Sequence, residues 1–268
     1  MQRITQARAK NKAAGEPILM PFKNMKSGGT FIRKGQLTLI AAAPGGAKSA
    51  VTQSILQRGD DRGNKNSVFY FCADSSPWDL FTRAAAIETG RTIDDIEREA
   101  ETDGTERLNK VVDSATRHMM TDFRSDPDDL YITGQLEAYA ELYGRYPEVI
   151  VMDNLKNLEL GNGEDEFRAL EDASVFLHDI AKDTNAAVIA LHHVRGDLED
   201  GYSQLPLSGI RGKVSKTPSL ILTLWRREMQ NGLLINASVV KARGGKGDPS
   251  GNMYYPLMAD LSRMSFIG

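Results

Sequence analysis

The chain has 268 residues, of which 41% are hydrophobic, and this is enough to fill one substantial core. Disordered and fibrous proteins are therefore excluded. No apolar run reaches the ~18 residues that a membrane span needs, and the polar, basic start lacks the apolar core of a signal peptide. We expect no membrane contact. The single cysteine, Cys72, excludes an internal disulfide.

The net charge of −3 is unevenly distributed along the chain. Residues 1–34 hold eight Lys or Arg and one acid, Glu16, so this segment carries +7 and the rest carries −10. An acidic body does not indicate a general nucleic-acid binder, and phosphate contacts would need local basic patches. Residues 1–20 are expected to form a basic arm or linker, either as a solvated tail or in contact with a neighbouring subunit or nucleic acid. Residues 21–268 are expected to form one domain.

Strands and helices alternate through the first half of this domain. We expect strands at residues 35–42 and 67–74 and a helix between them at 47–63. A second helix is expected to begin at Pro77 and to end at residue 90, and a surface-exposed helical stretch is expected at 92–119.

The second half repeats the alternation and ends in a hairpin. We expect a short strand at residues 130–133, a helix at 134–146 and an apolar strand at 148–155. An amphipathic helix at 168–185 is expected next, followed by strands at 186–194 and 220–225 and the hairpin at 233–257. Apolar strands that alternate with helices predict an α/β fold with a mostly parallel sheet and helices on both faces. Ligands in such sheets bind at the carboxyl ends of the strands.

A phosphate-binding loop is predicted between the first strand and the first helix. The sequence AAPGGAKS at 42–49 has P-loop spacing, with Ala at both positions usually given as Gly. Its backbone N–H groups and the helix N-terminus would face phosphate. The residues expected to bind nucleotide here are Pro44, Gly45, Gly46, Ala47, Lys48 and Ser49. Lys48 would reach the β and γ phosphates, and Ser49 would hold Mg²⁺. The methyl group of Ala47 lies where phosphate approaches, although a helix-start conformation would suit Ala.

A second carboxylate fits the same chemistry. The strand VIVMD at 149–153 ends in Asp153, where a Walker B carboxylate would hold the water shell of Mg²⁺. Two motifs in the expected order within one sheet pattern predict a nucleotide site more strongly than either does alone.

From about residue 20 onward, the chain resembles the C-terminal motor domain of DnaB-type replicative helicases, a branch of the RecA-like P-loop ATPases found in phages and bacteria. Beyond the two motifs above, VFYFCADSSPWDLFTR resembles the strand that ends in a catalytic glutamate, with Asp74 in its place. VIALHHVRG resembles the strand that ends in a γ-phosphate sensor, with His193 in place of glutamine. VVKARGGKG resembles the lysine and arginine finger, which implies that Lys241 and Arg243 act in a neighbour's ATP site.

The resemblance also implies where DNA would be contacted. The loop at 160–167 corresponds to one that lines a central DNA channel, and PLSGIRGKVSKTPSLILTLWR corresponds to the segment with the second DNA-facing loop. Arg211, Lys213 and Lys216 would contact the DNA backbone there, although a solvated loop is the competing interpretation. His192 and His193 are not expected to share a metal ion, because neighbours on a strand point to opposite faces. Residues 1–20 are expected to supply at most a short arm and no counterpart of the family's primase-interacting domain, so loader and primase contacts are not carried over.

The resemblance implies an ATP- and Mg²⁺-dependent helicase that forms a homo-oligomeric, hexameric ring on single-stranded DNA in the cytoplasm, the bacterial host's if a phage encodes it. An ATP-gated single-stranded DNA-binding protein of the recombinase or strand-annealing type is the main alternative. Asp74, one methylene shorter than glutamate, and Ala47 favour that alternative. An ATPase that acts on protein is a third possibility.

Overall fold

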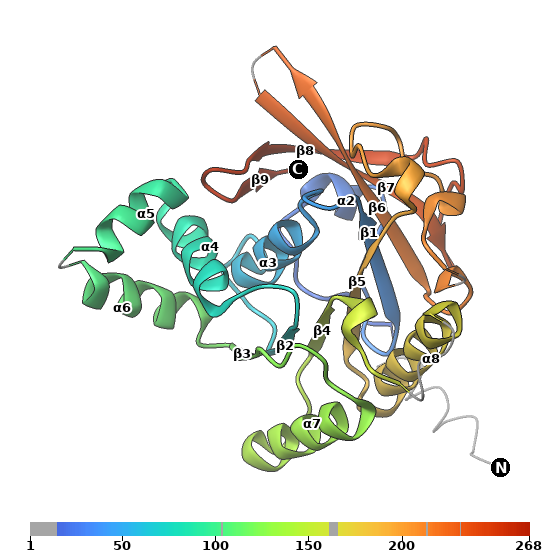
Figure 1. Ribbon diagram of the computed structural model, residues 1–268, viewed down its shortest axis with the longest axis horizontal. Coiled ribbons are helices and arrows are strands. Elements are labelled where there is room, and N and C mark those ends of the chain that lie inside the picture. Colours follow the sequence, from blue (N-terminus) through green and yellow to red (C-terminus); the bar gives the residue numbers. More distant parts are fainter. Residues whose placement is uncertain (1–14, 103, 161–165, 213, 231) are drawn as a thin grey trace.

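The computed structural model describes residues 15–102, 104–160, 166–212, 214–230 and 232–268. Within this part of the chain, nine strands form one sheet in the order β3-β2-β4-β5-β1-β6-β7-β8-β9 (Figure 1). Strands β3 to β6 of that order are parallel, and β7, β8 and β9 extend the sheet in antiparallel fashion. The predicted α/β fold with a mostly parallel sheet is confirmed. None of the described helices is long and apolar enough to cross a membrane.

The strands have the following bounds: β1 Leu37–Ala42, β2 Val68–Cys72, β3 Met119–Asp122, β4 Val149–Asp153, β5 Ala187–His193, β6 Leu220–Met229, β7 Gly232–Ala242, β8 Tyr254–Asp260 and β9 Ser265–Ile267. The α-helices are α2 Lys23–Ser27, α3 Lys48–Arg58, α4 Pro77–Thr89, α5 Ile93–Ala100, α6 Thr105–Thr116, α7 Asp129–Tyr143 and α8 Glu166–Thr184. The 3₁₀ turns that bear on the site are η1 Leu155–Asn157 and η4 Val214–Lys216.

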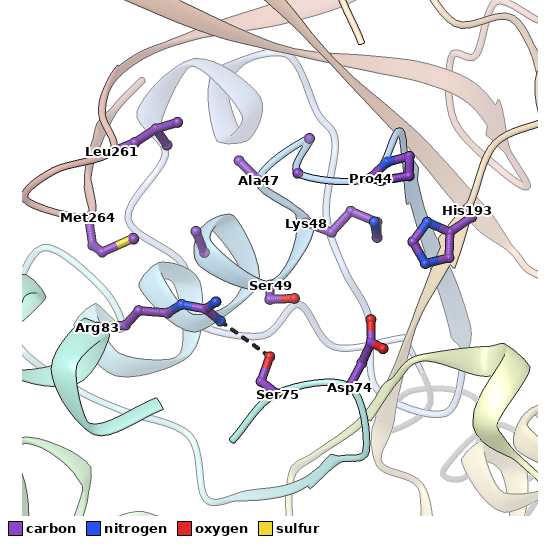
Figure 2. Close-up of a pocket in the computed structure, with 13 residues that line it drawn as sticks. Pro44, Ala47, Lys48, Ser49, Asp74, Ser75, Arg83, His193, Leu261 and Met264 are labelled. Atoms are coloured by element: carbon purple, nitrogen blue, oxygen red, sulfur yellow. Dashed lines mark hydrogen bonds between the residues drawn. The ribbon is translucent and has the colours of Figure 1, made fainter. Parts of the chain in front are cut away.

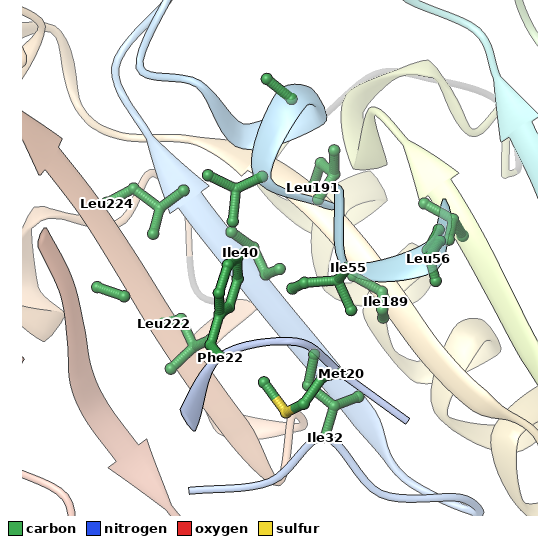
Figure 3. Close-up of a cluster of buried hydrophobic side chains, with 14 of the residues drawn as sticks. Met20, Phe22, Ile32, Ile40, Ile55, Leu56, Ile189, Leu191, Leu222 and Leu224 are labelled. Atoms are coloured by element: carbon green, nitrogen blue, oxygen red, sulfur yellow. The ribbon is translucent and has the colours of Figure 1, made fainter. Parts of the chain in front are cut away.

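The two faces of the sheet carry separate hydrophobic cores, because successive strand residues point to opposite sides. On β1, Ile40 and Ala42 face α3 and the N-terminal segment, whereas Leu39 and Ala41 face α7 and α8. Figure 3 shows Ile189 beside Ile55 of α3, and Ile40 and Leu222, from the two next strands, close to Phe22 of the N-terminal segment. Burial on both faces explains why these strands read as continuous apolar runs.

The N-terminal segment is part of the first core. Ile18, Met20, Phe22 and Met25 are each at most 3% exposed and belong to the core on this face of β1; Figure 3 shows Met20 and Phe22 there. Two backbone hydrogen bonds hold the segment in place: the Ile18 N–H donates to the Ile32 carbonyl, and the Lys34 N–H donates to the Glu16 carbonyl, each at 2.9 Å. Packing against the domain therefore begins before residue 21, while most of the expected arm, residues 1–14, lies outside the described part.

The predicted strand at residues 130–133 is wrong, because these residues form the first turns of α7. Asp128 caps this helix by accepting a hydrogen bond from the backbone N–H of Tyr131 at 2.7 Å. The edge strand is instead β3, which pairs with β2 in parallel. The sequence predicts helix up to residue 119 and no strand over residues 120–122. Pairing with β2 overrides the weak local preference of this short segment.

The single helical stretch expected over 92–119 is two helices, α5 and α6, that project from the sheet beside α4 (Figure 1). They are not wholly a solvated surface, since Ile96, Leu108 and Val112 form a small core with Ala84 and Ala85 of α4. The predicted start of α4 at Pro77 is confirmed, with Ser76 and Asp79 forming a capping box.

Truncation of Met20 tests whether the N-terminal segment stabilises the domain. Met20→Ala should lower the free energy of unfolding by about 2–5 kcal/mol, because it leaves a cavity in the core. Met229→Ala, at a half-exposed methionine of β6, is the matched control and should change it by less than about 0.5 kcal/mol. Urea unfolding measures both. Equal, small effects would show that the segment is only loosely attached.

Candidate nucleotide-binding site

A tight turn joins β1 to α3 and forms the predicted P-loop. The backbone N–H of Gly46 donates to the carbonyl of Ala43 at 2.9 Å. A Cβ on Gly46 would lie 2.8 Å from both the Ala42 Cβ and the Ala43 oxygen, so only glycine fits this position. Gly45 has φ of +67°, which also favours glycine. The turn therefore needs both glycines of the motif.

Ala47, directly before α3, adopts φ 65° and ψ 18°. The expectation that Ala sits here in a helix-start conformation is wrong, because this backbone is left-handed and crowds an L side chain. The usual glycine of the motif meets no such penalty. The P-loop shape is kept despite the alanine, at a cost in conformational energy.

A cavity of about 340 Å³ opens in front of this turn. Figure 2 shows Asp74 and His193 toward one end of it and Leu261 and Met264 toward the other. The cavity is lined by the P-loop and the start of α3, and by residues of the loop after β2, α4, β5 and the β8–β9 turn, namely Pro44, Gly45, Gly46, Ala47, Lys48, Ser49, Ala50, Asp74, Ser75, Arg83, His193, Leu261 and Met264. Every predicted P-loop residue is therefore at one cavity with two of the predicted catalytic side chains.

Lys48 and Asp153 are both buried at the floor of the site, 6% and 1% exposed. Burial lowers the pKa of Lys48, against the attraction of Asp153 and Asp74. Burial likewise raises the pKa of Asp153, against the hydroxyls of Ser49 and Tyr70. The Tyr70 hydroxyl donates to Asp153 Oδ2 at 2.9 Å. A cation desolvated in this way gains from an anionic ligand such as phosphate.

Asp74 lies beside Asp153 because the backbone N–H groups of Ala73 and Asp74 both donate to the Asp153 carbonyl, at 2.7 and 3.1 Å. Asp74 Oδ2 accepts a hydrogen bond from Asn154 Nδ2 at 2.8 Å, and its Oδ1 lies 3.9 Å from Lys156 Nζ. The same Asn154 amide is 3.0 Å from His193 Nε2. Burial lowers the pKa of His193 to about 4, so the ring is neutral near pH 7.

The residues present fit a magnesium ion. The chain supplies a hydroxyl, Ser49, and a carboxylate, Asp153, whose buried Oδ1 lacks a well-formed hydrogen bond. Mg²⁺ favours such oxygen ligands and takes only one or two from protein, the others coming from phosphate and water. The described residues contain no cluster of three or more His, Cys, Asp or Glu that could hold a metal ion by themselves.

The predicted finger residues, Arg211 and Lys216 lie away from this cavity. Lys241 Nζ donates to the carbonyls of Ser215 and Lys216 at 2.6 and 2.8 Å, and Arg243 Nη2 donates to that of Lys216 at 2.6 Å. Both finger residues thus bind η4. Arg211 pairs with Glu166 and Lys216 with Glu171, both on α8. Lys213 and most of the loop at 160–167 lie outside the described residues.

Comparison with known proteins identifies the family. Residues 20–254 match the model of the DnaB-like helicase C-terminal domain. The chain belongs to the DnaB-like helicase C-terminal domain family. It is 33% identical to the Gene 65 protein of Mycobacterium phage L5, covering 96% of this chain and 92% of the relative, and 35% identical to the Gene 65 protein of Mycobacterium phage D29, covering 87% and 96%.

Two solved structures share the fold of this DnaB-like domain at 16% sequence identity. The first, an ATPase domain, has a TM-score of 0.77, covering 98% of this chain and 96% of that one. The second, a DnaB-like replicative helicase described with its primase interactions, has a TM-score of 0.80, covering 99% and 67%. The RecA-like fold is confirmed, and family membership makes the chain a P-loop ATP hydrolase of the helicase class.

The structure adds residues to this DnaB-like site that the sequence did not single out. They are Tyr70, Arg83, Asn154 and Lys156. Arg83 reaches the cavity from α4, with its guanidinium 3.5 Å from Ser75 Oγ (Figure 2). Asn154 and Lys156 directly follow the Walker B strand, and polar residues at a strand's carboxyl end are a usable signal. Tyr70 is inside a buried strand and gives no such signal.

Relief of the left-handed backbone at residue 47 should stabilise this DnaB-like domain. Ala47→Gly is expected to raise the free energy of unfolding by roughly 1 kcal/mol, because glycine adopts this conformation freely. Ala138→Gly, at an exposed position within α7, should lower it by about 1 kcal/mol through loss of helix propensity. Thermal or urea unfolding compares the two. A lower stability of Ala47→Gly would contradict the backbone assignment.

Proposed function

We propose that the chain binds Mg·ATP in the P-loop cavity and couples its hydrolysis to movement along single-stranded DNA as a hexameric ring. The observation that carries this proposal is the convergence of Lys48, Ser49, Asp74, Asp153 and His193 at one sheet edge, while the finger residues lie elsewhere. The cavity contains the residues proposed to bind nucleotide but not Lys241 and Arg243, so a neighbouring subunit would supply these two residues in the oligomer.

The proposed roles follow from the chemistry of each group. Lys48 places its charge at the β and γ phosphates, and Ser49 and Asp153 hold Mg²⁺, which would neutralise phosphate charge. Asp74 orients and polarises the attacking water. His193 hydrogen-bonds the γ phosphate. In the transition state, charge spreads over the γ oxygens, and Lys241 and Arg243 of a neighbouring subunit stabilise it.

The DNA interface is proposed at the loop that carries Arg211, Lys213 and Lys216. Arg211 and Lys216 are exposed, and their ion pairs with Glu166 and Glu171 are surface pairs that contribute little stability. A DNA phosphate can therefore replace either carboxylate at small cost. The chain's net negative charge makes such a local contact necessary, since no long-range attraction draws DNA to the body of the domain.

Turnover with and without single-stranded DNA, measured beside particle mass, separates the helicase from its main alternative. A closed ring whose ATPase rate rises with DNA supports a motor. DNA binding that needs nucleotide but shows negligible turnover supports a recombinase- or annealing-type protein. If the protein binds no DNA and its ATPase rate is the same with and without DNA, then DNA is not its substrate.

Mixing two inactive variants tests catalysis in trans. Lys48→Ala removes the phosphate-binding cation, and Arg243→Ala removes a transition-state contact, so each alone should hydrolyse ATP poorly. In mixed oligomers some interfaces join an intact P-loop to an intact Arg243, and single-turnover hydrolysis should partly return. No recovery in oligomers shown by mass to be mixed would refute the trans finger.

Salt titration tests the DNA interface. Arg211→Ala or Lys216→Ala should each make the slope of log affinity against log salt shallower by ~0.7 for single-stranded DNA, because one phosphate contact is lost. Lys182→Ala is the matched control, since this exposed α8 lysine also pairs with a carboxylate, Asp179, but lies outside the loop. If both loop variants keep the wild-type slope, this loop does not face DNA.

A further inference from the structure

Asn154 lies between Asp74, which orients the attacking water in the proposed function, and His193, which hydrogen-bonds the γ phosphate. It directly follows Asp153 at the end of β4, and its side chain is fully buried. The strand order places β4 between β2 and β5. Asp74 follows β2, and His193 ends β5. One side chain directly after β4 can therefore contact a residue at the end of each neighbouring strand.

The Asn154 amide makes both contacts with the same nitrogen. Nδ2 lies 2.8 Å from Asp74 Oδ2 and 3.0 Å from His193 Nε2. A carboxamide nitrogen carries two hydrogens, so the two bonds can form together. The reverse orientation would set Oδ1 against a carboxylate, which only accepts. Oδ1 has no partner among the described residues, so the orientation is fixed by the nitrogen's two bonds.

This arrangement also fixes the state of His193. Because Nδ2 donates, Nε2 must accept, and a neutral ring then carries its hydrogen on Nδ1. Asn154 restrains Asp74 through its hydrogen bond to Oδ2, and the exposed Lys156 ammonium lies 3.9 Å from Oδ1. A carboxylate shorter than glutamate has a narrower range of positions from which it can reach water, so such restraint matters more for aspartate.

We propose that Asn154 is a positioning residue that joins the water-orienting carboxylate and the γ-phosphate sensor into one hydrogen-bonded unit. Asn154 holds the Asp74 carboxylate where this short side chain can reach the attacking water, and it selects the Nδ1–H tautomer of His193. Asn154 itself does not touch the reacting atoms. The inference rests on the proposed hydrolysis of ATP at this cavity.

The test compares Asn154→Leu with Asn157→Leu. Leucine keeps the size of asparagine but cannot donate. Asn157 is the matched control because it ends the η1 turn that Asn154 precedes, and its amide donates to the Ser125 carbonyl at 3.2 Å, away from the site. Asn154→Leu should lower kcat about 10- to 100-fold, as loss of a supporting contact does, with little change in KM. Asn157→Leu should leave both near wild type.

The second readout is the ring tautomer of His193 in nucleotide-free protein, from ¹⁵N NMR of histidine-labelled samples, with the signal assigned by its absence in His193→Gln. Wild type and Asn157→Leu should show Nδ1–H, and Asn154→Leu should lose that preference. An Nε2–H tautomer in the wild type would overturn the proposal even if Asn154→Leu does not fold. So would unchanged kcat in a folded Asn154→Leu.

Lys48→Ala separates this inference from the function beneath it. If Lys48→Ala abolishes turnover while Asn154→Leu changes neither kcat nor the tautomer, ATP hydrolysis at the cavity stands and the role of Asn154 falls. If Lys48→Ala retains full turnover, the proposed function fails, and the tautomer measurement still reports whether the amide binds His193.

Discussion

The parallel register of the central strands determines where every chemically active group lies. Cys72 pairs with Asp153 and Ala42 pairs with His193, so the carboxyl ends of β1, β2, β4 and β5 coincide at one edge. The Asp153 carbonyl accepts from two residues beyond β2 and thereby extends this register into the loop that carries Asp74. Residues more than a hundred positions apart in sequence meet at that edge because a shift of one residue would exchange the side chains of the two cores, which the packing on each face opposes.

The charges at this edge are arranged for a ligand more than for the stability of the ligand-free fold. Lys48 and Asp153 are each destabilised in their charged forms by burial, and each is helped by the other. A buried pair of this kind adds little net stability. The left-handed Ala47 adds a further cost in the same turn. Both costs are typical of a site whose groups are held in place for binding.

The sequence was sufficient for features that depend on local pattern and insufficient for those that depend on tertiary contact. The P-loop, the Asp153 strand and the start of α4 at Pro77 each combine apolar periodicity with a local signal, and the structure has all three elements where expected. The short β3 was missed because only its pairing with β2 makes it a strand. Asn154 was missed because its two partners come from other strands. The resemblance placed Asp74 and His193 but not the amide that joins them.

The loop between β5 and β6 contacts both the site and the finger. The backbone N–H of Arg211 donates to the His193 carbonyl at 3.4 Å, and His192 Nε2 lies 2.8 Å from the Arg211 carbonyl, so this part of the loop is held by the end of β5. A few residues further along the chain, the carbonyls of Ser215 and Lys216 accept hydrogen bonds from Lys241 and Arg243. If the proposed function holds, DNA bound at Lys216 rests on the same turn that holds the finger. DNA binding at Lys216 and the position of Lys241 and Arg243 relative to a neighbour's ATP would then both depend on η4. This would give a physical basis for DNA-stimulated turnover without any contact between DNA and nucleotide.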